Sequence, residues 1–416
     1  MTEKKRFHLL RLKKERIRMK AREIIKDIHY VGVNDRVTVK FEEQWPLPNG
    51  VSYNSYIVKG SEATALIDTV KIDTVNTYLQ KIGSEKIDYL IVNHMEPDHS
   101  GSIPEVAKLY PDMKIVCNAI AAGMIKGFCH ITDEKRFLIV KDGDEISLGN
   151  HTLRFYMTPM VHWPETMMTY VTDLKTIFSG DGFGTFGALN GGILDSELVT
   201  DLYFREMYRY YSNIVGKYGR SVINALNKLK DVELEYICPT HGPVWHDEIP
   251  KVMELTRQLG SYESERGVVI IYGSMYGNTA EFAEEIASKL SELGEKNIII
   301  HNAAHSEMSD MISDAFRYDT LLVGSCVYSM RLFPPIETFL NAMETREIKN
   351  KTFGGFGSFS WANGASEAKF REFSERLKLP LSATFSFKHA MHDGTAQNAR
   401  EFAEQIWEVR KKAINL

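Results

Sequence analysis

One short segment of the sequence holds four side chains of the kinds that bind metal ions in proteins. His94, Glu96, Asp98 and His99 lie within six residues, directly after the apolar run Tyr89–Val92. In an extended backbone successive side chains alternate between two faces, so we expect His94, Glu96 and Asp98 to project to one side. Taken alone, this segment could also be a hydrophilic loop that happens to hold two histidines.

The neighbours of this segment shape its backbone. Pro97 restricts Glu96 to extended geometry, which helps to hold the side chains apart. We expect the chain to bend at Ser100–Gly101, and this bend lets His99 turn toward the others. The pattern therefore predicts an extended array of ligands that is closed by a bend.

Three more candidate ligands follow downstream, each at the end of an apolar run and beside small or stiff residues: His162, Asp181 and His241. A lone histidine such as His241 is more often structural than a ligand, but the repeated setting favours one shared site. Four histidines, two terminal carboxylates and one bridging carboxylate suit two metal ions, each with two histidines and one carboxylate. Two ions about 3.5–4 Å apart could share the ends of one diatomic molecule.

A second group of residues is suited to binding a phosphate. The run Ser274–Thr279 follows the apolar strand Val268–Tyr272 and precedes a helical pattern. Its two terminal hydroxyls, the small Gly277 and the backbone N–H groups at a helix N-terminus make a phosphate cradle. The run has no Gly-Lys-Ser/Thr, so it is not a Walker loop, and it has no GxGxxG dinucleotide fingerprint.

Two further loops, Gly324–Ser329 and Gly357–Gly364, also follow predicted strands. In a doubly wound sheet such loops share the C-terminal edge with the phosphate loop, where ligands bind. Tyr328 and Trp361 could flank a flavin ring while backbone amides contact its polar edge, although each alone could be a packed surface aromatic. The predicted flavin contacts are Ser274, Met275, Tyr276, Gly277, Asn278, Thr279, Ser325, Val327, Tyr328, Ser329, Ser358, Phe359, Ser360, Trp361, Asn363 and Gly364.

The elements that must position the metal ligands lie between Val39 and Val244, where short apolar runs rich in β-branched residues alternate with polar turns. Helical patterns at Ile103–Leu109 and Arg220–Leu229 interrupt these runs. A mixed α/β domain with substantial sheet is expected. The predicted strands include Ser55–Lys59, Ala65–Ile67, Tyr89–Val92, Lys114–Cys117 and Leu153–Met157.

The C-terminal part alternates strands and helices, which predicts a doubly wound parallel sheet. The expected strands are Val268–Tyr272, Asn297–Ile300, Thr320–Val323 and Thr352–Phe356, and helices begin near Thr279, Ser309, Ile336, Glu367 and Asn398. A polar run at Ser261–Gly267 marks the domain boundary. The predicted domains are a basic N-terminal extension (1–30), a metal-binding domain (31–264) and a flavin domain (265–416).

The composition of the 416 residues excludes several classes of protein. With 50 Lys+Arg against 55 Asp+Glu, the net charge of −5 provides no global field that favours nucleic acid or an anionic membrane. No apolar run approaches the roughly 20 residues that span a bilayer. We therefore expect neither nucleic acid nor a membrane as a partner.

The four cysteines and the N-terminal segment indicate where in the cell the protein is expected to work. Cys117, Cys129, Cys238 and Cys326 form neither a disulfide framework nor a CxxC pair, so structural thiols in a reducing cytoplasm are expected. The basic segment Met1–Arg22 has no clean apolar run of a secretory signal. It is either a solvated helical extension or a docking arm for an acidic partner.

The order and setting of the metal-binding side chains resemble the metallo-β-lactamase fold, a four-layer αββα sandwich. Hydrolases of that fold carry HxHxDH and two zinc ions, whereas this chain has Glu96 at the second histidine. A carboxylate there hardens the site and favours iron. The pattern resembles the flavodiiron proteins, which implies His94, Glu96 and His162 on one iron, Asp98, His99 and His241 on the other, and Asp181 between them.

From Val268 through the C-terminal helix, the chain resembles flavodoxin, which implies FMN. The family resemblance implies reduction of O2 to water or of NO to N2O, and we expect O2 with NO as the alternative. It also implies a head-to-tail homodimer or a homotetramer, since the two cofactors of one subunit lie far apart in the family. The CxxC pairs of a fused rubredoxin are absent. An external donor is therefore expected, either rubredoxin or a reduced deazaflavin.

Three further expectations concern Tyr211, Trp163 and the remaining histidines. Tyr211 resembles a family tyrosine beside the irons, with core packing as its other interpretation, and Trp163 is expected to hold the loop of His162. The remaining histidines lack a matching setting and are expected at the surface or behind the ligands. They are His8, His29, His130, His151, His246, His301, His305, His389 and His392.

Two other functions fit parts of the sequence. The first is a dizinc hydrolase with a flavodoxin-like module, against which Glu96 is the main argument. The second is a non-catalytic electron carrier in which the metal domain serves as a scaffold, against which the seven intact ligands argue.

Overall fold

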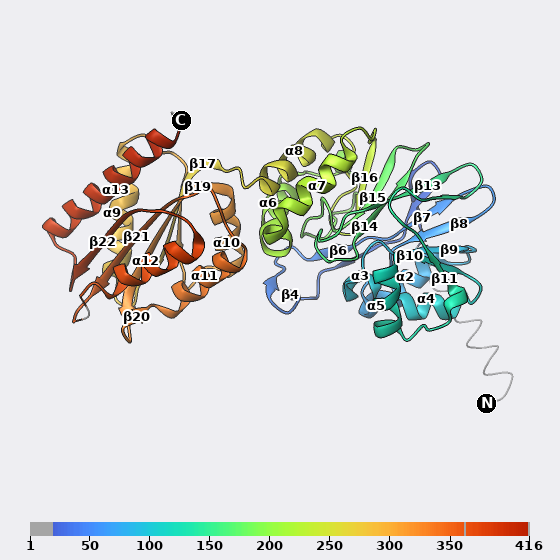
Figure 1. Cartoon of the computed structure of the whole chain (residues 1–416), viewed down its shortest axis with the longest axis horizontal. Helices are drawn as coiled ribbons and strands as arrows, with labels where there is room; N and C mark the ends of the chain where they lie inside the picture. The colour runs from blue at the N-terminus through green and yellow to red at the C-terminus, as the bar shows by residue number, and fades with distance from the viewer. Residues whose placement is uncertain (1–19, 362, 415–416) are drawn as a thin grey trace. The chain divides into compact units, whose positions relative to one another are not determined.

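The computed structural model describes residues 20–361 and 363–414 (Figure 1). They form two compact units, which are considered separately. The first unit contains the described residues up to Thr38 together with Asn49–Thr200 and Lys228–Ile249, and the second contains Val39–Pro48, Asp201–Asn227 and the residues from Pro250 onward. Because each unit draws on several stretches, the single boundary expected at 264/265 stays a prediction. Most of the basic segment, residues 1–19, lies outside the described residues.

The first unit is built on a seven-stranded mixed sheet of short apolar strands. Its strands pair in the order β1-β2-β7-β8-β9-β10-β11, antiparallel from β1 to β8 and parallel from β8 to β11. Residues 22–30 of the predicted extension thus supply an edge hairpin. The bounds are Arg22–Ile25, Ile28–Tyr30, Tyr56–Lys59, Thr64–Ile67, Tyr89–Ile91, Lys114–Cys117 and Phe137–Ile139.

A five-stranded sheet in the order β12-β13-β14-β15-β16 completes the strands of this unit, apart from the short pair β3 (Val33–Asp35) and β6 (Val51–Tyr53). Neighbours are antiparallel except β15 and β16, which run parallel. Strands β14 and β15 are buried at every position, so both faces of the sheet are covered. The bounds are Glu145–Ser147, Thr152–Met157, Met167–Val171, Thr176–Gly180 and Tyr236–Pro239.

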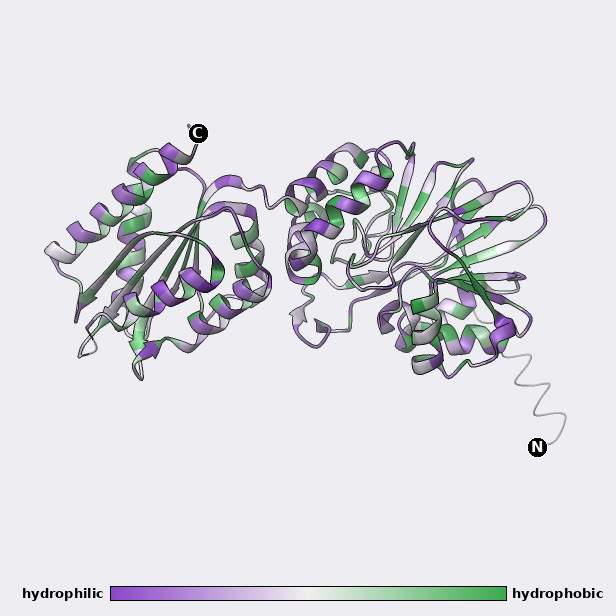
Figure 2. Ribbon diagram, in the orientation of Figure 1, coloured by the Kyte–Doolittle hydropathy of each residue, from purple (hydrophilic) through white to green (hydrophobic). Residues whose placement is uncertain are grey.

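Helices connect the parallel strands of the first unit. Asn118 begins α5 as its N-cap, because its Oδ1 accepts hydrogen bonds from the backbone N–H groups of Ile120 (3.1 Å) and Ala121 (3.0 Å). Figure 2 shows both apolar and polar residues on the helices of this unit, as expected for helices that cover a sheet on one face. The helices are α2 (Val75–Ile82), α3 (Pro97–Ser100), α4 (Ile103–Leu109) and α5 (Ala119–Cys129).

The second unit contains the predicted doubly wound sheet. Its parallel strands have the order β18-β17-β19-β21-β22, and the short β20 pairs antiparallel with β19. The strands are β17 (Glu265–Gly273), β18 (Ile298–Asn302), β19 (Tyr318–Tyr328), β20 (Arg331–Leu332), β21 (Thr352–Phe359) and β22 (Leu381–Lys388). Four of the five parallel strands were predicted, whereas β22 was missed.

The helices of the second unit begin close to the predicted positions. They are α9 (Asn278–Glu292), α10 (Met308–Arg317), α11 (Pro334–Thr345), α12 (Ala365–Leu377) and α13 (Asp393–Ile414). Phe282 on α9 anchors the core, since its ring stacks on Phe356, Phe385 and Phe387 at centroid distances of 5.4, 5.6 and 5.1 Å. Further helical segments of this unit are α6 (Asp201–Tyr210), the π-helix Tyr211–Val215, most of α7 (Gly219–Leu229) and most of α8 (Ile249–Gly260).

Two predictions about the chain as a whole can be compared with the structure. Among the described residues, no helix is both long and apolar enough to cross a membrane. All four cysteines are free thiols, three of them buried, whereas Cys129 is partly exposed.

Candidate functional site

The first four candidate ligands follow the end of strand β9. Glu96 has φ −58° and ψ 136°, so it is extended as Pro97 demands. The bend comes earlier than predicted, because Pro97 occupies the first turn of α3 and starts the helix there. The expectation of an extended array through Asp98 and a bend at Ser100–Gly101 was therefore wrong. Asp98 and His99 project from one helical turn instead.

The structure brings His94, Glu96 and His162 together around one oxygen of Asp181. The Nε2 atom of His162 lies 2.9 Å from Glu96 Oε2 and 3.1 Å from Asp181 Oδ2. The Nε2 atom of His94 lies 3.5 Å from Glu96 Oε2 and 3.7 Å from Asp181 Oδ2. These side chains form what we call the first cluster.

Asp98, His99 and His241 gather in the same way around the other oxygen of Asp181. His99 Nε2 lies 3.1 Å from Asp98 Oδ1 and 3.1 Å from Asp181 Oδ1. His241 Nε2 lies 3.2 Å from Asp98 Oδ2 and 3.6 Å from Asp181 Oδ1. We call these three side chains the second cluster.

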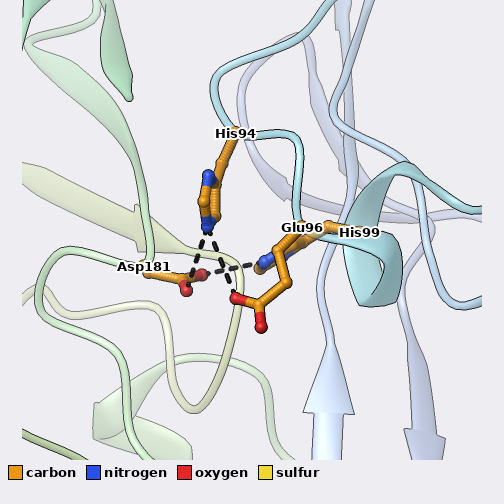
Figure 3. Close-up of side chains that lie close together, drawn as sticks. All are labelled: His94, Glu96, His99 and Asp181. Atoms are coloured by element: carbon orange, nitrogen blue, oxygen red, sulfur yellow. Dashed lines mark ion pairs between the residues drawn. The ribbon is translucent and has the colours of Figure 1, made fainter. Parts of the chain in front are cut away.

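Asp181 therefore stands between two clusters that each contain two imidazoles and one carboxylate. Figure 3 shows His94 and Glu96, from the loop between β9 and α3, and His99, from α3, pointing toward Asp181. Asp181 itself follows β15, and His241 follows the parallel neighbour β16, where Thr240 N donates to Gly180 O at 2.9 Å. The ends of strands from both sheets thus meet at one place.

The chemistry of these clusters fits metal ions. His94 Nε2, His99 Nε2 and both carboxylate oxygens of Asp98 are buried and make no hydrogen bond within the described part of the chain. Buried polar atoms without such partners are costly unless an ion binds them. Imidazole nitrogens and carboxylate oxygens are ligands that suit iron and zinc, and both clusters provide them.

The charges of the two clusters stabilise one another. Although burial alone would raise the pKa of Asp181, the surrounding histidines, His99 first, hold it well below its usual range. In the same way, the hydrogen bond from His162 and the nearby imidazole of His94 outweigh burial and lower the pKa of Glu96. For His162, burial favours a lower pKa, but Asp181 and Glu96 raise it to about 9. Asp181 and Glu96 are therefore ionised, as metal binding requires.

Several residues that sequence reasoning did not identify orient the candidate ligands. Glu165 Oε1 lies 2.7 Å from His94 Nδ1, and His241 Nδ1 lies 2.7 Å from the backbone oxygen of Ser52. The hydroxyl of Thr240 donates to Asp181 Oδ1 at 2.5 Å. Each histidine with such a partner at Nδ1 turns its Nε2 toward Asp181. Glu165 comes three residues after His162, but its type and spacing alone gave no signal.

The contacts of the Tyr211 side chain do not indicate a function for it. It starts the π-helix Tyr211–Val215 in the second unit, it is buried, and its hydroxyl has no hydrogen-bond partner among the described residues. Burial raises the pKa of Tyr211, with Tyr262 as a minor contributor. Its predicted place beside the metal ions stays a prediction. Trp163 stands edge-on to His94, with ring centroids 5.4 Å apart.

The second unit contains a pocket at the C-terminal ends of β17, β19 and β21. Residues from all three predicted flavin loops line it: Ser274, Met275, Tyr276, Asn278, Thr279, Val327, Ser329, Ser358, Phe359, Ser360 and Trp361. Cys326, Met330 and His389 also line it. The other predicted contacts do not line the pocket; they are Gly277, Ser325, Tyr328, Asn363 and Gly364.

Hydrogen bonds shape the loops around this pocket. Ser274 Oγ accepts from Gly277 N at 3.1 Å, and the hydroxyls of Thr279 and Ser358 lie 2.8 Å apart, which joins the first loop to the third. Gly277 has φ +95°, a conformation that only glycine adopts easily. Ser325 holds its own loop, since its Oγ accepts from Phe333 N at 2.8 Å.

The missed pocket residue His389 follows the missed strand β22. Its backbone N–H donates to the carbonyl oxygen of Phe359 at 2.8 Å, which holds it beside the third loop. A correct prediction of β22 would have placed His389 at the same sheet edge as the other loops. The rest of the histidines set aside above are absent from both clusters and from this pocket, with His8 outside the described residues.

Comparisons with known proteins agree with this division of the chain. A family described as "ODP family beta lactamase" matches residues 51–242, and the Flavodoxin family matches residues 270–407. An anaerobic nitric oxide reductase flavorubredoxin from Salmonella paratyphi B is 32% identical over 391 residues, which is 91% of this chain and 81% of the relative. An Escherichia coli flavorubredoxin is 31% identical over the same lengths.

Among the solved structures that resemble this chain are two that cover nearly all of it. Rubredoxin oxygen:oxidoreductase from Desulfovibrio gigas gives a TM-score of 0.90 at 28% identity and covers 95% of this chain and 100% of its own. A flavoprotein from Thermotoga maritima gives a TM-score of 0.85 at 28% identity, with 94% and 98% covered. The fold predicted from the sequence is confirmed. The chain belongs to the flavodiiron family of oxidoreductases, with a metallo-β-lactamase-like domain followed by a flavodoxin-like domain.

Proposed function

We propose that this protein reduces O2 to water, with NO reduction to N2O as the alternative, at a diiron centre that receives electrons through FMN. The observation that carries this proposal is the convergence of six metal-binding side chains on two sides of a seventh, Asp181. The flavin-type pocket in the second unit supplies the second cofactor site. The relatives named above are reductases of NO and O2, which supports both substrates.

The two clusters suggest which residues hold each iron. The first iron would take His94, Glu96 and His162, and the second would take Asp98, His99 and His241, with Asp181 bridging the two. The carboxylate of Glu96 favours iron over zinc, because a hard oxygen ligand replaces an imidazole. When bound, the diiron centre supplies the Lewis acidity and the electrons for reduction of a small diatomic molecule.

The surrounding residues of the chain bury the metal-binding atoms and orient the ligand side chains. Each ligand histidine is at most 5% exposed, which limits the access of bulk water to the metal-binding atoms. Thr240 donates to Asp181, and this hydrogen bond fixes the plane of the bridging carboxylate. Three ligand side chains per metal, with the shared carboxylate, leave open coordination positions for the substrate.

The flavin pocket would hold the FMN phosphate at the N-terminus of α9. Ser274 and Thr279 offer hydroxyls there, and the loops after β19 and β21 would contact the ring system. FMN accepts electrons singly or in pairs, so it suits transfer between a protein donor and metal ions. Rubredoxin is the proposed donor because the names of both relatives, flavorubredoxin and rubredoxin oxygen:oxidoreductase, contain it, with a deazaflavin as the alternative.

The proposed assembly is a head-to-tail homodimer or a homotetramer that works in the cytoplasm. It would place the FMN of one subunit beside the diiron centre of another. Tyr211 would then act near the irons, as the family resemblance implies. The basic segment before residue 20 would adjust donor docking or packing between subunits.

Anaerobic turnover of the iron-loaded, FMN-containing protein with reduced rubredoxin tests the proposal. O2 and NO are supplied separately, and iron, zinc and flavin are measured on the same sample. Two irons per chain, a flavin spectrum and fast consumption of one gas are expected, and the faster gas identifies the substrate. His94→Ala should abolish turnover, whereas His246→Ala, a histidine outside both clusters, should not. Zinc without flavin and no gas consumption would instead favour a hydrolase.

A further inference from the structure

One buried carboxylate beside the metal centre is not among the seven proposed ligands. Glu165 is 1% exposed, and its Oε1 accepts hydrogen bonds from His94 Nδ1 at 2.7 Å and from the backbone N–H of Met95 at 2.9 Å. Its other oxygen, Oε2, is buried without a hydrogen-bond partner among the residues that the structure describes. A carboxylate that is kept in this costly position calls for an explanation beyond packing.

The backbone around Glu165 is firmly held. Its carbonyl oxygen accepts from Asn118 Nδ2 at 2.5 Å, and Asn118 is itself fixed as the N-cap of α5. The loop closes at its base, where Thr158 N donates to Thr166 O at 3.0 Å. Glu165 therefore meets His94 from a rigid loop rather than from a mobile side chain.

The same loop carries His162, the other imidazole of the first cluster. Glu165 thus connects the loop of one histidine to the side chain of the other, so it supports both imidazoles on the same side of Asp181. The Nδ1 atom of His241 has a different partner, the backbone oxygen of Ser52, which belongs to another part of the first unit.

The two clusters differ in the acceptors behind their histidines. His94 faces a carboxylate, whereas His241 faces a neutral backbone oxygen, that of Ser52. The Nδ1 atom of His99 is buried without a hydrogen-bond partner among the described residues. A carboxylate acceptor makes an imidazole a stronger donor to metal than a carbonyl does, and it fixes the ring more firmly.

We propose that Glu165 is a positioning residue that acts on one metal position only, the one formed by His94, Glu96 and His162. It sets the orientation and donor strength of His94, and it makes the two metal positions inequivalent. This inference rests on the proposed function, because it assumes that both clusters bind iron.

The test compares Glu165→Ala and Glu165→Gln with the wild type in the full-length, FMN-containing protein. Ferrous iron is added anaerobically, its binding is measured by competition with a chelator, and its environment is measured by Mössbauer spectroscopy. For Glu165→Ala we expect the affinity of one iron to fall by about 10–100-fold, while the other iron keeps its affinity. One of two Mössbauer components should change.

The glutamine variant separates the hydrogen bond from the charge. Glu165→Gln keeps an oxygen that can accept from His94, so its loss of affinity should be smaller than that of Glu165→Ala, with the same Mössbauer component altered. If Glu165→Ala fails to fold, this component in Glu165→Gln decides the matter. The matched control is Asp195→Asn, another buried carboxylate of the first unit, whose Oδ2 accepts hydrogen bonds from the backbone N–H groups of His246 and Glu248. It should leave both irons unchanged.

The outcomes distinguish the inference from the proposed function. A wild-type protein that takes up no iron would overturn the proposed function and this inference with it. A wild type with two irons would leave the function standing. Variants that then lose both irons equally, or that keep both with an unchanged spectrum, would overturn the role of Glu165 alone.

Discussion

In the first unit, the four histidines that face Asp181 are between 0 and 5% exposed, whereas in the second unit Trp361 at the flavin pocket is 87% exposed and Tyr276 is 90% exposed. Metal ligands must be held at fixed distances, so they extend from strand ends and a helical turn and are oriented by buried partners. A flat ring needs access and surfaces to stack on, so loops supply them. The candidate metal ligands are therefore buried and held by their neighbours, whereas two aromatic rings at the flavin pocket are open to solvent.

The largest expected effect comes from the residue shared by both clusters. Asp181→Ala removes an oxygen from each metal position and leaves four buried histidines without their central anion. We expect both metals to be lost. Turnover should fall by more than the roughly 100-fold that is typical when a residue that only orients a metal ligand is removed. Metal analysis and turnover measure this, while FMN content should stay the same. Asp142→Ala, a partly exposed carboxylate of the same unit, is the control. Retention of two metals would contradict the bridging role.

The next largest effect is expected in the pH dependence of metal binding, which should distinguish the metal site from the flavin pocket. The neighbouring carboxylates raise the pKa of His162 to about 9 against the effect of burial, so the metal-free site holds a proton there at neutral pH. A metal ion binds only the neutral imidazole, so binding must release this proton. The affinity should therefore rise with pH between about 6 and 8, by up to about tenfold per pH unit for each proton released. Titration with Zn²⁺ in several buffers measures this slope, and FMN affinity should change less.

A backbone change tests the flavin loop. Gly277→Ala meets no atom within 4 Å, so its cost comes only from φ +95°. We expect a loss of about 1–2 kcal/mol, seen as weaker FMN binding or a lower unfolding temperature of the second unit. Gly123→Ala is the matched control, because Gly123 lies in the helix α5 and its added methyl group also meets nothing. That variant should be neutral or slightly more stable. Equal effects would argue against strain at Gly277.

The smallest effect is expected at the rim of the flavin pocket. Trp361→Ala should weaken FMN binding by about 0.5–1.5 kcal/mol, the range for aromatic stacking, without changing stability, since the side chain is exposed. Tyr328→Ala is the comparison, because Tyr328 was predicted to flank the ring but does not line the pocket. Fluorescence titration of the FMN-free protein measures both. A larger loss for Tyr328→Ala than for Trp361→Ala would support the predicted place of Tyr328 beside the ring.

The sequence predicted the side chains that carry chemistry better than those that support them. His162, Asp181 and His241 each stand at the end of an apolar run, and strand ends share an edge, so their meeting could be expected. Glu165 could not be found in this way, because its partner His94 is 71 residues away and only the packing of the loop joins them. The spacing of residues within one short segment cannot reveal a contact between two segments that are far apart in the sequence.

Strand β22 shows a different kind of failure. In Leu381–Lys388 apolar and small polar residues alternate, and the polar ones interrupt the run that identified the other strands. The strand pairs along β21, and this pairing could not be recognised from one segment alone. Missing the strand also concealed His389, because a residue can be assigned to a sheet edge only after its strand is known.

The parallel pairing of β15 with β16 has a consequence for how the protein is made. Asp181 and His241 follow these two strands, which are separated by some fifty residues of chain. During synthesis, a chain that has emerged only as far as Asp181 has no second imidazole for Asp98 and His99. The second metal position therefore comes into existence only after β16 joins its sheet, and capture of the full metal pair must wait for this late step. A truncated or stalled chain could hold at most half of the centre.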